Sequence, residues 1–272
     1  MFVKRLVVAI VLVPTGVLLI YVGGVIFTAF VGVILALAAW EFSHLFKVTG
    51  LRPASFLVVG GSLTLFIGRA IDGFESAPLL ITLLFLICMI YHLVQFERGL
   101  PHSGTDFSIT LGGAIYIGWL GAYFVSLRQL PDGMWWLLLV LPAVWLADSG
   151  AYSIGRAFGK RPLSQRLSPK KTWEGYFGGI LFGTLGGALL AWLWSFALEP
   201  GSGMSPWAGA VLGLVLAVLT PLGDLGESMF KRQAGVKDSS NLIPGHGGAL
   251  DRIDSWLWAA PIGYYIIFYF IL

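Results

Sequence analysis

Long apolar runs follow one another along almost the whole of this 272-residue chain. A helix that crosses a lipid bilayer needs roughly 20 mostly apolar residues, and nine stretches of the sequence meet that requirement. The sequence therefore predicts an all-α, polytopic integral membrane protein with about nine transmembrane helices. We expect these helices near residues 5–22, 23–43, 54–72, 77–96, 106–127, 133–156, 173–197, 205–230 and 254–272.

Composition points the same way. Hydrophobic residues make up 57% of the chain and charged residues only 11%, whereas a soluble domain carries about 25% charged residues. A soluble fold of this length could not bury so much apolar surface. The single cysteine, Cys88, excludes an intrachain disulfide and a zinc site built from cysteines, and we expect it to be a small buried hydrophobe. The basic N-terminus resembles a signal peptide, but no A-x-A-like cleavage site follows, so we expect a retained span.

Basic residues are distributed unevenly between the connections. With the N-terminus in the cytoplasm, only Arg69 and Arg128 of the 17 Lys and Arg residues fall on the outer side. Because cytoplasmic connections are enriched in Lys and Arg, we expect a cytoplasmic N-terminus. We divide the chain into residues 1–130, a helical scaffold that could supply a dimer contact, and residues 131–272, which carry the cytoplasmic catalytic stretches. Many of the 36 glycines lie inside spans, where we expect them to let helices pack closely.

Two charged stretches interrupt the apolar pattern, at residues 145–175 and 223–254. In the first stretch, Asp148 directly follows the apolar segment LVLPAVWLA. A carboxylate at that depth is costly unless it is paired or binds a cation. Asp148 could form a structural pair with Arg156 or Lys160, or it could belong to a functional site.

The connection from Gly159 to Lys171 holds five basic residues. Ser168 and Pro169 have the pattern of a helix N-cap followed by proline at the first helical position, which predicts that the seventh span begins here. Backbone amides at a helix start, next to Lys170 and Lys171, suit a phosphate group. The alternative is a plain basic loop that contacts anionic lipid headgroups.

In the second stretch, carboxylates recur three residues apart, at Asp224 and Glu227 and again at Asp251 and Asp254. On a helix each pair shares one face. Oxygen ligands without cysteine favour a hard cation such as Mg²⁺, and salt bridges to neighbouring basic side chains are the alternative. The candidate partners for such salt bridges are Lys231, Arg232 and Arg252.

The segment LIPGHGGALDR lies between these two carboxylate pairs. Its glycines let backbone amides approach a ligand closely, and His246 could donate to a phosphate or only cap the turn. Anion-binding groups beside a candidate metal site, at a membrane surface, favour phosphoryl or nucleotidyl transfer. Such chemistry depends mostly on positioning and charge neutralisation.

The second stretch closely resembles the signature of phosphatidate cytidylyltransferases, also called CDP-diacylglycerol synthases. That signature has a serine, Lys-Arg, a spaced Lys-Asp, Pro or Gly, His-Gly-Gly and Asp-Arg-x-Asp. Here it reads Ser228, Lys231-Arg232, Lys237-Asp238, Pro244, His246-Gly247-Gly248, Asp251-Arg252 and Asp254, with no departure. The first stretch is also similar, through residues 148–152 and 168–175.

The resemblance implies that CTP and phosphatidate react to give CDP-diacylglycerol and pyrophosphate, with Mg²⁺ as cofactor and K⁺ as a candidate second cation. It also implies a homodimer that is embedded in the inner membrane and contacts membrane lipid. The active site is expected to face the cytoplasm, and no nucleic-acid partner is expected. The implied catalytic residues are Asp224, Lys231, Arg232, Lys237, Asp238, His246, Asp251 and Arg252. The implied substrate-binding residues are Asp148, Ser168, Lys170, Lys171, Thr172, Glu174, Gly247 and Gly248. The implied metal ligands are Asp224, Asp251 and Asp254.

Two other functions stay open at this point. A CTP-dependent kinase of a polyprenol or similar lipid alcohol would need a general base near the alcohol, whereas phosphatidate arrives already ionised. The full signature favours the cytidylyltransferase. An ion-coupled transporter would suit acidic residues in spans, but the charges cluster at one face and the sequence shows no inverted repeat.

Overall fold

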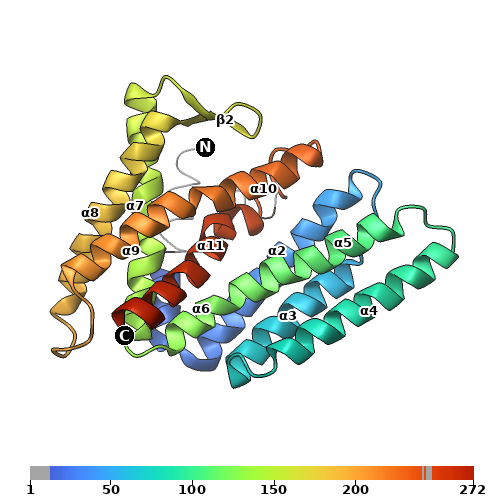
Figure 1. Cartoon of the computed structure of the whole chain (residues 1–272), viewed down its shortest axis with the longest axis horizontal. Coiled ribbons are helices and arrows are strands. Elements are labelled where there is room, and N and C mark those ends of the chain that lie inside the picture. The colour runs from blue at the N-terminus through green and yellow to red at the C-terminus, as the bar shows by residue number, and fades with distance from the viewer. Residues whose placement is uncertain (1–12, 241, 243–246) are drawn as a thin grey trace. The chain divides into compact units, whose positions relative to one another are not determined.

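The computed structural model describes residues 13–240, 242 and 247–272, and helices account for most of them (Figure 1). In this described part, seven helices are long and apolar enough to cross a membrane. They are Gly24–Lys47, Ser55–Asp72, Ala77–Glu97, Ser103–Gln129, Gly133–Phe158, Trp173–Ser195 and Pro206–Gln233. The structure agrees with a polytopic, mainly helical membrane protein, while the count of nine spans and the orientation of the N-terminus stay predictions.

The other two predicted spans lie at the ends of the chain. Of the first, near residues 5–22, only a short apolar helix at Val13–Val22 falls within the described residues. The last predicted span corresponds to α11 (Leu250–Ile266), which the π-helical turn η2 (Ile267–Ile271) continues.

The chain forms two compact units, and the first comprises the described residues up to 126 together with residues 230–253. Within it, α3 packs against α2, α4 and α5 (Figure 1). Its core includes Cys88 with Leu65, Leu84 and Ala114, so the expected role of Cys88 as a buried hydrophobe is confirmed. The helices of this unit are α2 (Gly24–Lys47), α3 (Ser55–Asp72), α4 (Ala77–Glu97), α5 (Ser103–Ala114), the π-helical turn η1 (Ile115–Trp119) and most of α6 (Leu120–Gln129).

An aromatic cluster ties the segment 230–253 to the rest of the first unit. The ring of Phe230 meets Phe42 and Phe46 of α2 edge-on, with ring centroids 5.2 and 6.1 Å apart. It also meets Tyr116 of η1, at 6.0 Å. Edge-to-face aromatic pairs each contribute about 0.5–1.5 kcal/mol beyond their buried area. Phe230 therefore fixes the start of the segment that carries most of the signature.

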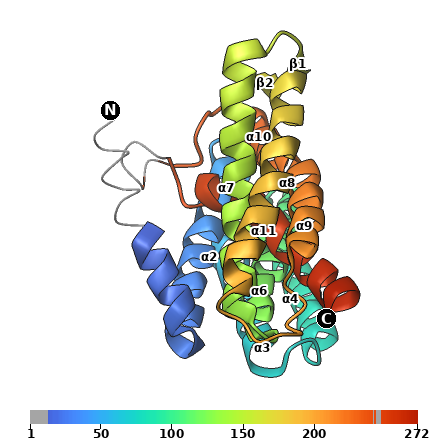
Figure 2. The same ribbon diagram turned by 90° about the vertical axis from the view of Figure 1, so that its left-hand side faces the viewer.

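The second unit comprises residues 127–229 and 254–272. Helix α8 packs against both α7 and α9 (Figure 2). Added side chains at Gly183 and Gly187 of α8 would collide with α9, and those at Gly209 and Gly213 of α9 would collide with α8. The expected packing role of the span glycines is confirmed here. The elements are α7 (Gly133–Phe158), β1 (Pro162–Ser164), β2 (Ser168–Thr172), α8 (Trp173–Ser195), α9 (Pro206–Leu219) and most of α10 (Pro221–Gln233) and α11.

The predicted helix start at Ser168 and Pro169 is wrong. These residues open β2, which pairs antiparallel with β1, so the fold is not purely α-helical. Helix α8 begins only at Trp173, where extended Thr172 is the N-cap and its hydroxyl accepts a hydrogen bond from the Gly175 N–H at 3.1 Å. Ser168 and Thr172 pair with Ser164 and Pro162 of β1. Both strands of this two-stranded sheet are edge strands, and proline is tolerated in an edge strand because it has no N–H to donate to a neighbour.

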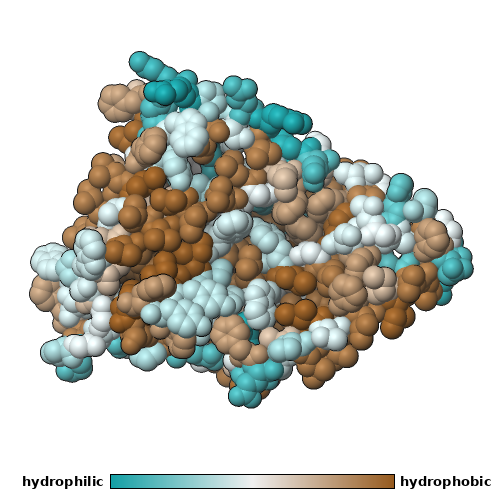
Figure 3. Space-filling model, viewed as in Figure 1, coloured by the Kyte–Doolittle hydropathy of each residue, from teal (hydrophilic) through white to brown (hydrophobic). Residues whose placement is uncertain are grey.

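In the second unit, the β1–β2 hairpin and the helices α8 and α9 differ in the hydropathy of their surfaces. In Figure 3, hydrophilic side chains gather over the β1–β2 hairpin, whereas the visible flank of α8 and α9 is mainly hydrophobic. Exposed apolar side chains on α8 include Phe177, Leu181, Leu185 and Leu189. A lipid environment accounts for this exposed apolar flank, and the hairpin carries the polar groups of the first charged stretch.

Candidate active site

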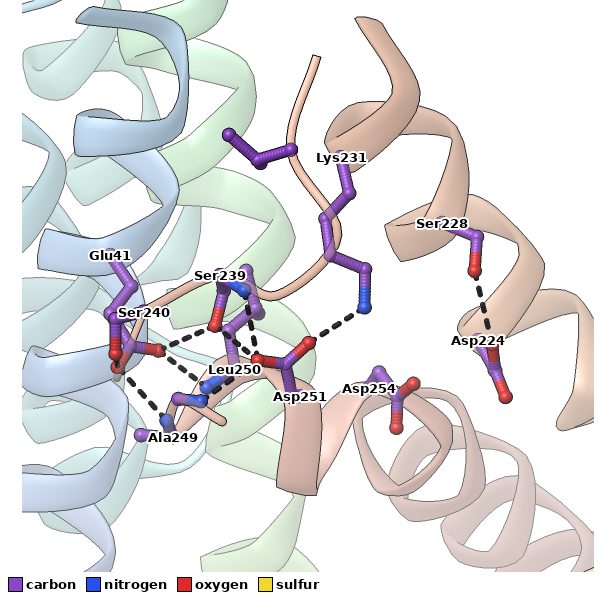
Figure 4. Close-up of polar contacts among 12 residues, drawn as sticks. Glu41, Asp224, Ser228, Lys231, Ser239, Ser240, Ala249, Leu250, Asp251 and Asp254 are labelled. Carbon is purple, nitrogen blue, oxygen red and sulfur yellow. Dashed lines mark hydrogen bonds and ion pairs between the residues drawn. The ribbon is translucent and has the colours of Figure 1, made fainter. Parts of the chain in front are cut away.

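A buried ion pair joins α10 to the first turn of α11 in the first unit. Lys231 Nζ lies 2.6 Å from Asp251 Oδ1, and the two side chains are only 12% and 6% exposed. The second oxygen, Asp251 Oδ2, accepts from the Ser239 N–H at 2.9 Å, the Ser239 hydroxyl at 2.7 Å and the Gly248 N–H at 2.8 Å (Figure 4). The structure therefore brings four signature-region residues into one hydrogen-bonded network around a single carboxylate.

These partners lower the pKa of Asp251. Burial alone would raise it, because burial disfavours the charged form. The hydrogen bonds from Lys231, Gly248 and Ser239, together with the charge of Lys231, outweigh burial and lower the pKa to about 2. The Asp251 carboxylate is therefore ionised at neutral pH, as a group that balances a buried lysine must be.

Glu41 of α2 belongs to the same network, although the motifs of the sequence do not single it out. Its carboxylate is fully buried, at 0% exposed. It accepts hydrogen bonds from the Ala249 N–H at 3.0 Å, the Leu250 N–H at 2.8 Å and the Ser240 hydroxyl at 2.6 Å (Figure 4). One signal in the sequence could have found it, since Glu41 is a lone acidic residue in the apolar run AFVGVILALAAWEF, where a carboxylate requires partners.

Gly247 and Gly248 give the backbone room beside these carboxylates. Gly247 has a φ of 84°, in the left-handed region that favours glycine, and an added Cβ there would lie 2.6 Å from Asp251 Oδ2. An added Cβ at Gly248 would collide with the Ser239 hydroxyl and the Glu41 carboxylate. The glycines therefore allow the loop to pack directly against two carboxylates.

The remaining signature residues of the first unit are mostly accessible to solvent. Arg232, Lys237, Asp238 and Arg252 are all exposed. The Arg232 guanidinium donates to the Val236 carbonyl at 3.3 Å. Exposed cationic groups of this kind can reach an anionic substrate. Two further predicted residues, Pro244 and His246, lie outside the described residues.

A second, more accessible ion pair lies in the second unit. Lys171, near the end of β2, places its Nζ 2.5 Å from Oδ2 of Asp224 in the first turn of α10, and the side chains are 30% and 34% exposed. The Ser228 hydroxyl donates to Asp224 Oδ1 at 3.3 Å. The sequence placed both charged residues in the site but did not predict that they contact one another.

Glu174 holds the hairpin against the start of α8. Its Oε2 accepts from the backbone N–H groups of Lys160 at 3.0 Å and Arg161 at 3.2 Å, and its Oε1 lies 3.5 Å from Arg161 Nε. Together with the Thr172 cap, these contacts give two predicted substrate-binding residues a local structural role. They also fix the strand that carries Lys171.

The other predicted residues of the second unit have different surroundings. Lys170 of β2 and Asp148 of α7 are exposed, and Ser168 is half-buried. Glu227, which shares the α10 helix with Asp224, is buried at 1% exposed. Lys170 and Asp148 are therefore the members of this set that are open to a ligand.

The carboxylates of the second unit have the chemistry that a hard cation needs. Gly223 packs directly against the backbone carbonyl of Asp254 within the second unit, so Asp224, the next residue of α10, lies near Asp254 of α11 (Figure 4). Asp254 Oδ1 also accepts from the Ser255 N–H at 2.7 Å. Carboxylate oxygens suit Mg²⁺. Within the part of the chain that the structure describes, no group of three or more His, Cys, Asp or Glu side chains is arranged to hold a metal ion.

Comparison with known proteins gives consistent matches over nearly the whole chain. The profile of the Cytidylyltransferase family matches residues 3–270. A phosphatidate cytidylyltransferase of Synechocystis sp. is 33% identical, over 97% of this chain and 96% of its own length. A protein of the same name from Brucella suis is 36% identical over 96% and 91%, and one from Mycobacterium leprae is 33% identical over 78% and 70%.

Proposed function

The chain belongs to the cytidylyltransferase family, and we propose that it transfers the cytidylyl group of CTP to phosphatidate in phospholipid biosynthesis. A phosphate oxygen of phosphatidate attacks the α-phosphorus of CTP. The bond between the α-phosphorus and the bridging oxygen breaks, and pyrophosphate leaves with its electron pair. CDP-diacylglycerol and pyrophosphate are the products, and no covalent intermediate on the protein is required.

The network around Asp251 is the observation that carries this proposal. A buried lysine, a serine and a glycine amide hold one carboxylate in a fixed position, with three signature residues among the four members. Phosphoryl-type transfer is accelerated mainly by fixed charges and by the positioning of the two anionic substrates, CTP and phosphatidate. A preorganised set of charges at the start of α11 is suited to that task.

The exposed cations supply the groups that bind the two anionic substrates. In the first unit these are Arg232, Lys237 and Arg252, and in the second unit Lys170 is exposed while Lys171 is about one-third exposed. Asp148 and Asp224 give the second unit acidic groups beside its lysines. We assign the lysines and arginines to phosphate binding, because cationic side chains lower the cost of bringing two anions together.

Mg²⁺ is the proposed cofactor, with K⁺ as a candidate second cation. Within the second unit, the oxygen ligands we assign to Mg²⁺ are the carboxylates of Asp224 and Asp254, whose donor chemistry suits a hard cation. When bound, Mg²⁺ neutralises charge on the phosphates of the nucleotide. Removal of divalent cations with a chelator should abolish turnover, and addition of Mg²⁺ should restore it.

We further propose a homodimer in the inner membrane, with the site on the cytoplasmic side, where CTP is available. The uneven distribution of Lys and Arg supports this orientation. Phosphatidate would keep its acyl chains in the bilayer and present its headgroup at the surface. That arrangement accounts for a nucleotide-using enzyme made almost entirely of apolar helices.

Two labelled nucleotides distinguish this reaction from its closest alternative. We expect that CTP labelled at the α-phosphorus transfers its label to lipid when phosphatidate is supplied, whereas label at the γ-phosphorus appears in pyrophosphate. A lipid kinase would show the opposite partition with a polyprenol, because it transfers the γ-phosphoryl group. Absence of α-label in lipid, with purified enzyme, phosphatidate and Mg²⁺, would refute the proposed function.

A further inference from the structure

Glu41 lies in α2, far along the chain from the signature, yet it contacts the segment that carries the signature. We propose that Glu41 is a positioning residue for cytidylyl transfer, which fixes the N-terminus of α11 and through it the carboxylate of Asp251. This role rests on the proposed function, because it concerns the same site. Glu41 acts through other residues and need not touch either substrate.

Two backbone amides bind the two carboxylate oxygens of Glu41 separately. The Ala249 N–H donates to Oε1 at 3.0 Å, and the Leu250 N–H donates to Oε2 at 2.8 Å. The first amides of a helix have no partner within the helix, and a carboxylate there also meets the positive end of the helix dipole. Glu41 therefore caps α11 from a different helix.

Two serines extend the contact toward the ion pair. The Ser240 hydroxyl donates to Glu41 Oε1 at 2.6 Å. The Ser239 hydroxyl lies 2.7 Å from Asp251 Oδ2 and 3.2 Å from Glu41 Oε2. A hydroxyl has one proton to donate, and the shorter distance assigns it to Asp251. Ser239 thus stands between the two carboxylates, so that displacement of Glu41 also disturbs a partner of Asp251.

The contact requires a carboxylate rather than any polar group of similar size. Both oxygens of Glu41 face a backbone N–H, which can only donate. In Glu41→Gln, one of these N–H groups would face the amide NH₂ and lose its acceptor in a fully buried place. A buried donor without an acceptor is unfavourable. Glu41→Asp keeps the charge but shortens the side chain by one methylene, so it cannot reach both amides without movement of α2 or α11.

Packing leaves little space for such movement. Glu41 is fully buried, and Gly248 lies so close to its carboxylate that an added Cβ would collide with it. Protein interiors are packed tightly enough to transmit small shifts. A change at Glu41 is therefore passed to the loop and to the first turn of α11, where Asp251 lies.

The test compares the purified full-length wild type with Glu41→Gln, using CTP, phosphatidate and Mg²⁺. We expect kcat to fall about 10- to 100-fold, the size of effect that misplacement of catalytic groups produces, while the KM for CTP changes little. Hydrogen exchange should become faster at the amides of Ala249 and Leu250. Ser240→Ala should cause a smaller loss, and its effect should be non-additive with Glu41→Gln, since both remove partners from one carboxylate.

Asp106→Asn is the matched control. Asp106 is also a buried carboxylate of the first unit and also accepts from a backbone amide, the Arg52 N–H at 2.7 Å. The Asp106→Asn variant should lower thermal stability, as Glu41→Gln should, because each removes a buried acceptor of a backbone N–H. The kcat of Asp106→Asn should stay near the wild-type value. Equal losses of kcat in both variants would show that Glu41 has only a general structural role.

The outcomes separate this inference from the function on which it rests. An active wild type with wild-type kcat in Glu41→Gln would refute the positioning role and leave the proposed function standing. Unchanged hydrogen exchange at Ala249 and Leu250 would refute it as well. A wild type that forms no CDP-diacylglycerol would overturn the proposed function and, with it, the role of Glu41.

Discussion

Lys171 and Asp224 meet at 2.5 Å although 53 residues separate them in the sequence. Their contact joins the end of β2 to the first turn of α10 in the second unit. About a third of each side chain is exposed to solvent, so water weakens the attraction between the charges. An exposed ion pair of this kind contributes only about 0–1 kcal/mol to stability. The contact therefore contributes little to stability, which leaves the role in phosphate binding that we propose for Lys171 as the one to test.

Lys171→Met should therefore reduce activity much more than it reduces stability. The substitution keeps an apolar side chain of similar length and removes the positive charge that we propose binds a substrate phosphate. We expect the KM for CTP or phosphatidate to rise about 10-fold, the equivalent of roughly 1.4 kcal/mol, with a small change in melting temperature. Lys160→Met is the matched control, because Lys160 is an exposed lysine near the same hairpin. Equal kinetic effects in the two variants would contradict the assignment.

Asp251→Asn should damage both activity and stability. The substitution removes one charged partner of the largely buried Lys231, and breaking one partner of a buried pair typically costs about 3–5 kcal/mol. We expect activity to fall at least ~10²-fold, because the charged groups that this carboxylate holds in place would be displaced. The double variant Lys231→Met, Asp251→Asn removes both charges of the pair, so it should recover part of the stability but not the activity. Recovery of activity in the double variant would show that the pair is only structural.

Acid should remove the stabilising contribution of Asp251 at an unusually low pH. The ordinary pKa of an aspartate here is 3.8, and the folded protein lowers it to about 2. A group with a lower pKa in the folded state stabilises the fold above its unfolded pKa and loses that effect as the pH falls through the folded pKa. The difference in melting temperature between wild type and Asp251→Asn should therefore be constant above about pH 4 and shrink toward pH 2. A difference that shrinks between pH 7 and pH 5 would disagree with this geometry.

Local sequence patterns predicted the helices well because each depends on residues close in the chain. The predicted spans 77–96 and 133–156 correspond to α4 at Ala77–Glu97 and α7 at Gly133–Phe158. The Ser168–Pro169 cap signal failed for a physical reason. Ser168 pairs with Ser164 of β1, and a pairing between two strands cannot be predicted from the few residues around a candidate cap.

Long-range pairings could not be predicted in the same way. Spacing shows which carboxylates share a helix face, but it does not show which cation approaches them. The sequence offered arginine and lysine neighbours for Asp224, and the structure pairs it with Lys171. For Glu41, the apolar surroundings indicated that a partner was needed. Only the packing of α2 against the start of α11 identifies that partner as two backbone amides.

Thr172 should be replaceable by serine but not by alanine. Its hydroxyl accepts from the Gly175 N–H at the start of α8, and loss of such an N-cap costs about 0.5–2 kcal/mol. We expect Thr172→Ala to lower the melting temperature and Thr172→Ser to keep most of it, because serine retains the hydroxyl. Thermal unfolding followed by tryptophan fluorescence would measure this difference. Equal stability of the alanine and serine variants would show that the cap contributes nothing.

Gly248→Ala should be among the most damaging of the small substitutions. The added methyl group would collide with the Ser239 hydroxyl and the Glu41 carboxylate, so the loop must move away from Asp251. We expect loss of most of the activity, at least ~10²-fold, because catalytic groups tolerate displacements of only about 1 Å. Activity should be measured as formation of CDP-diacylglycerol at saturating CTP.

Gly226→Ala is the control variant for Gly248→Ala. Gly226 lies in α10, and an added Cβ there has no neighbour within 4 Å. Alanine is favoured over glycine inside a helix by about 0.5–1 kcal/mol, so this variant should be as stable as the wild type or slightly more so, with unchanged turnover. If Gly248→Ala were as active as Gly226→Ala, close packing of the loop against the two carboxylates would not be required for catalysis.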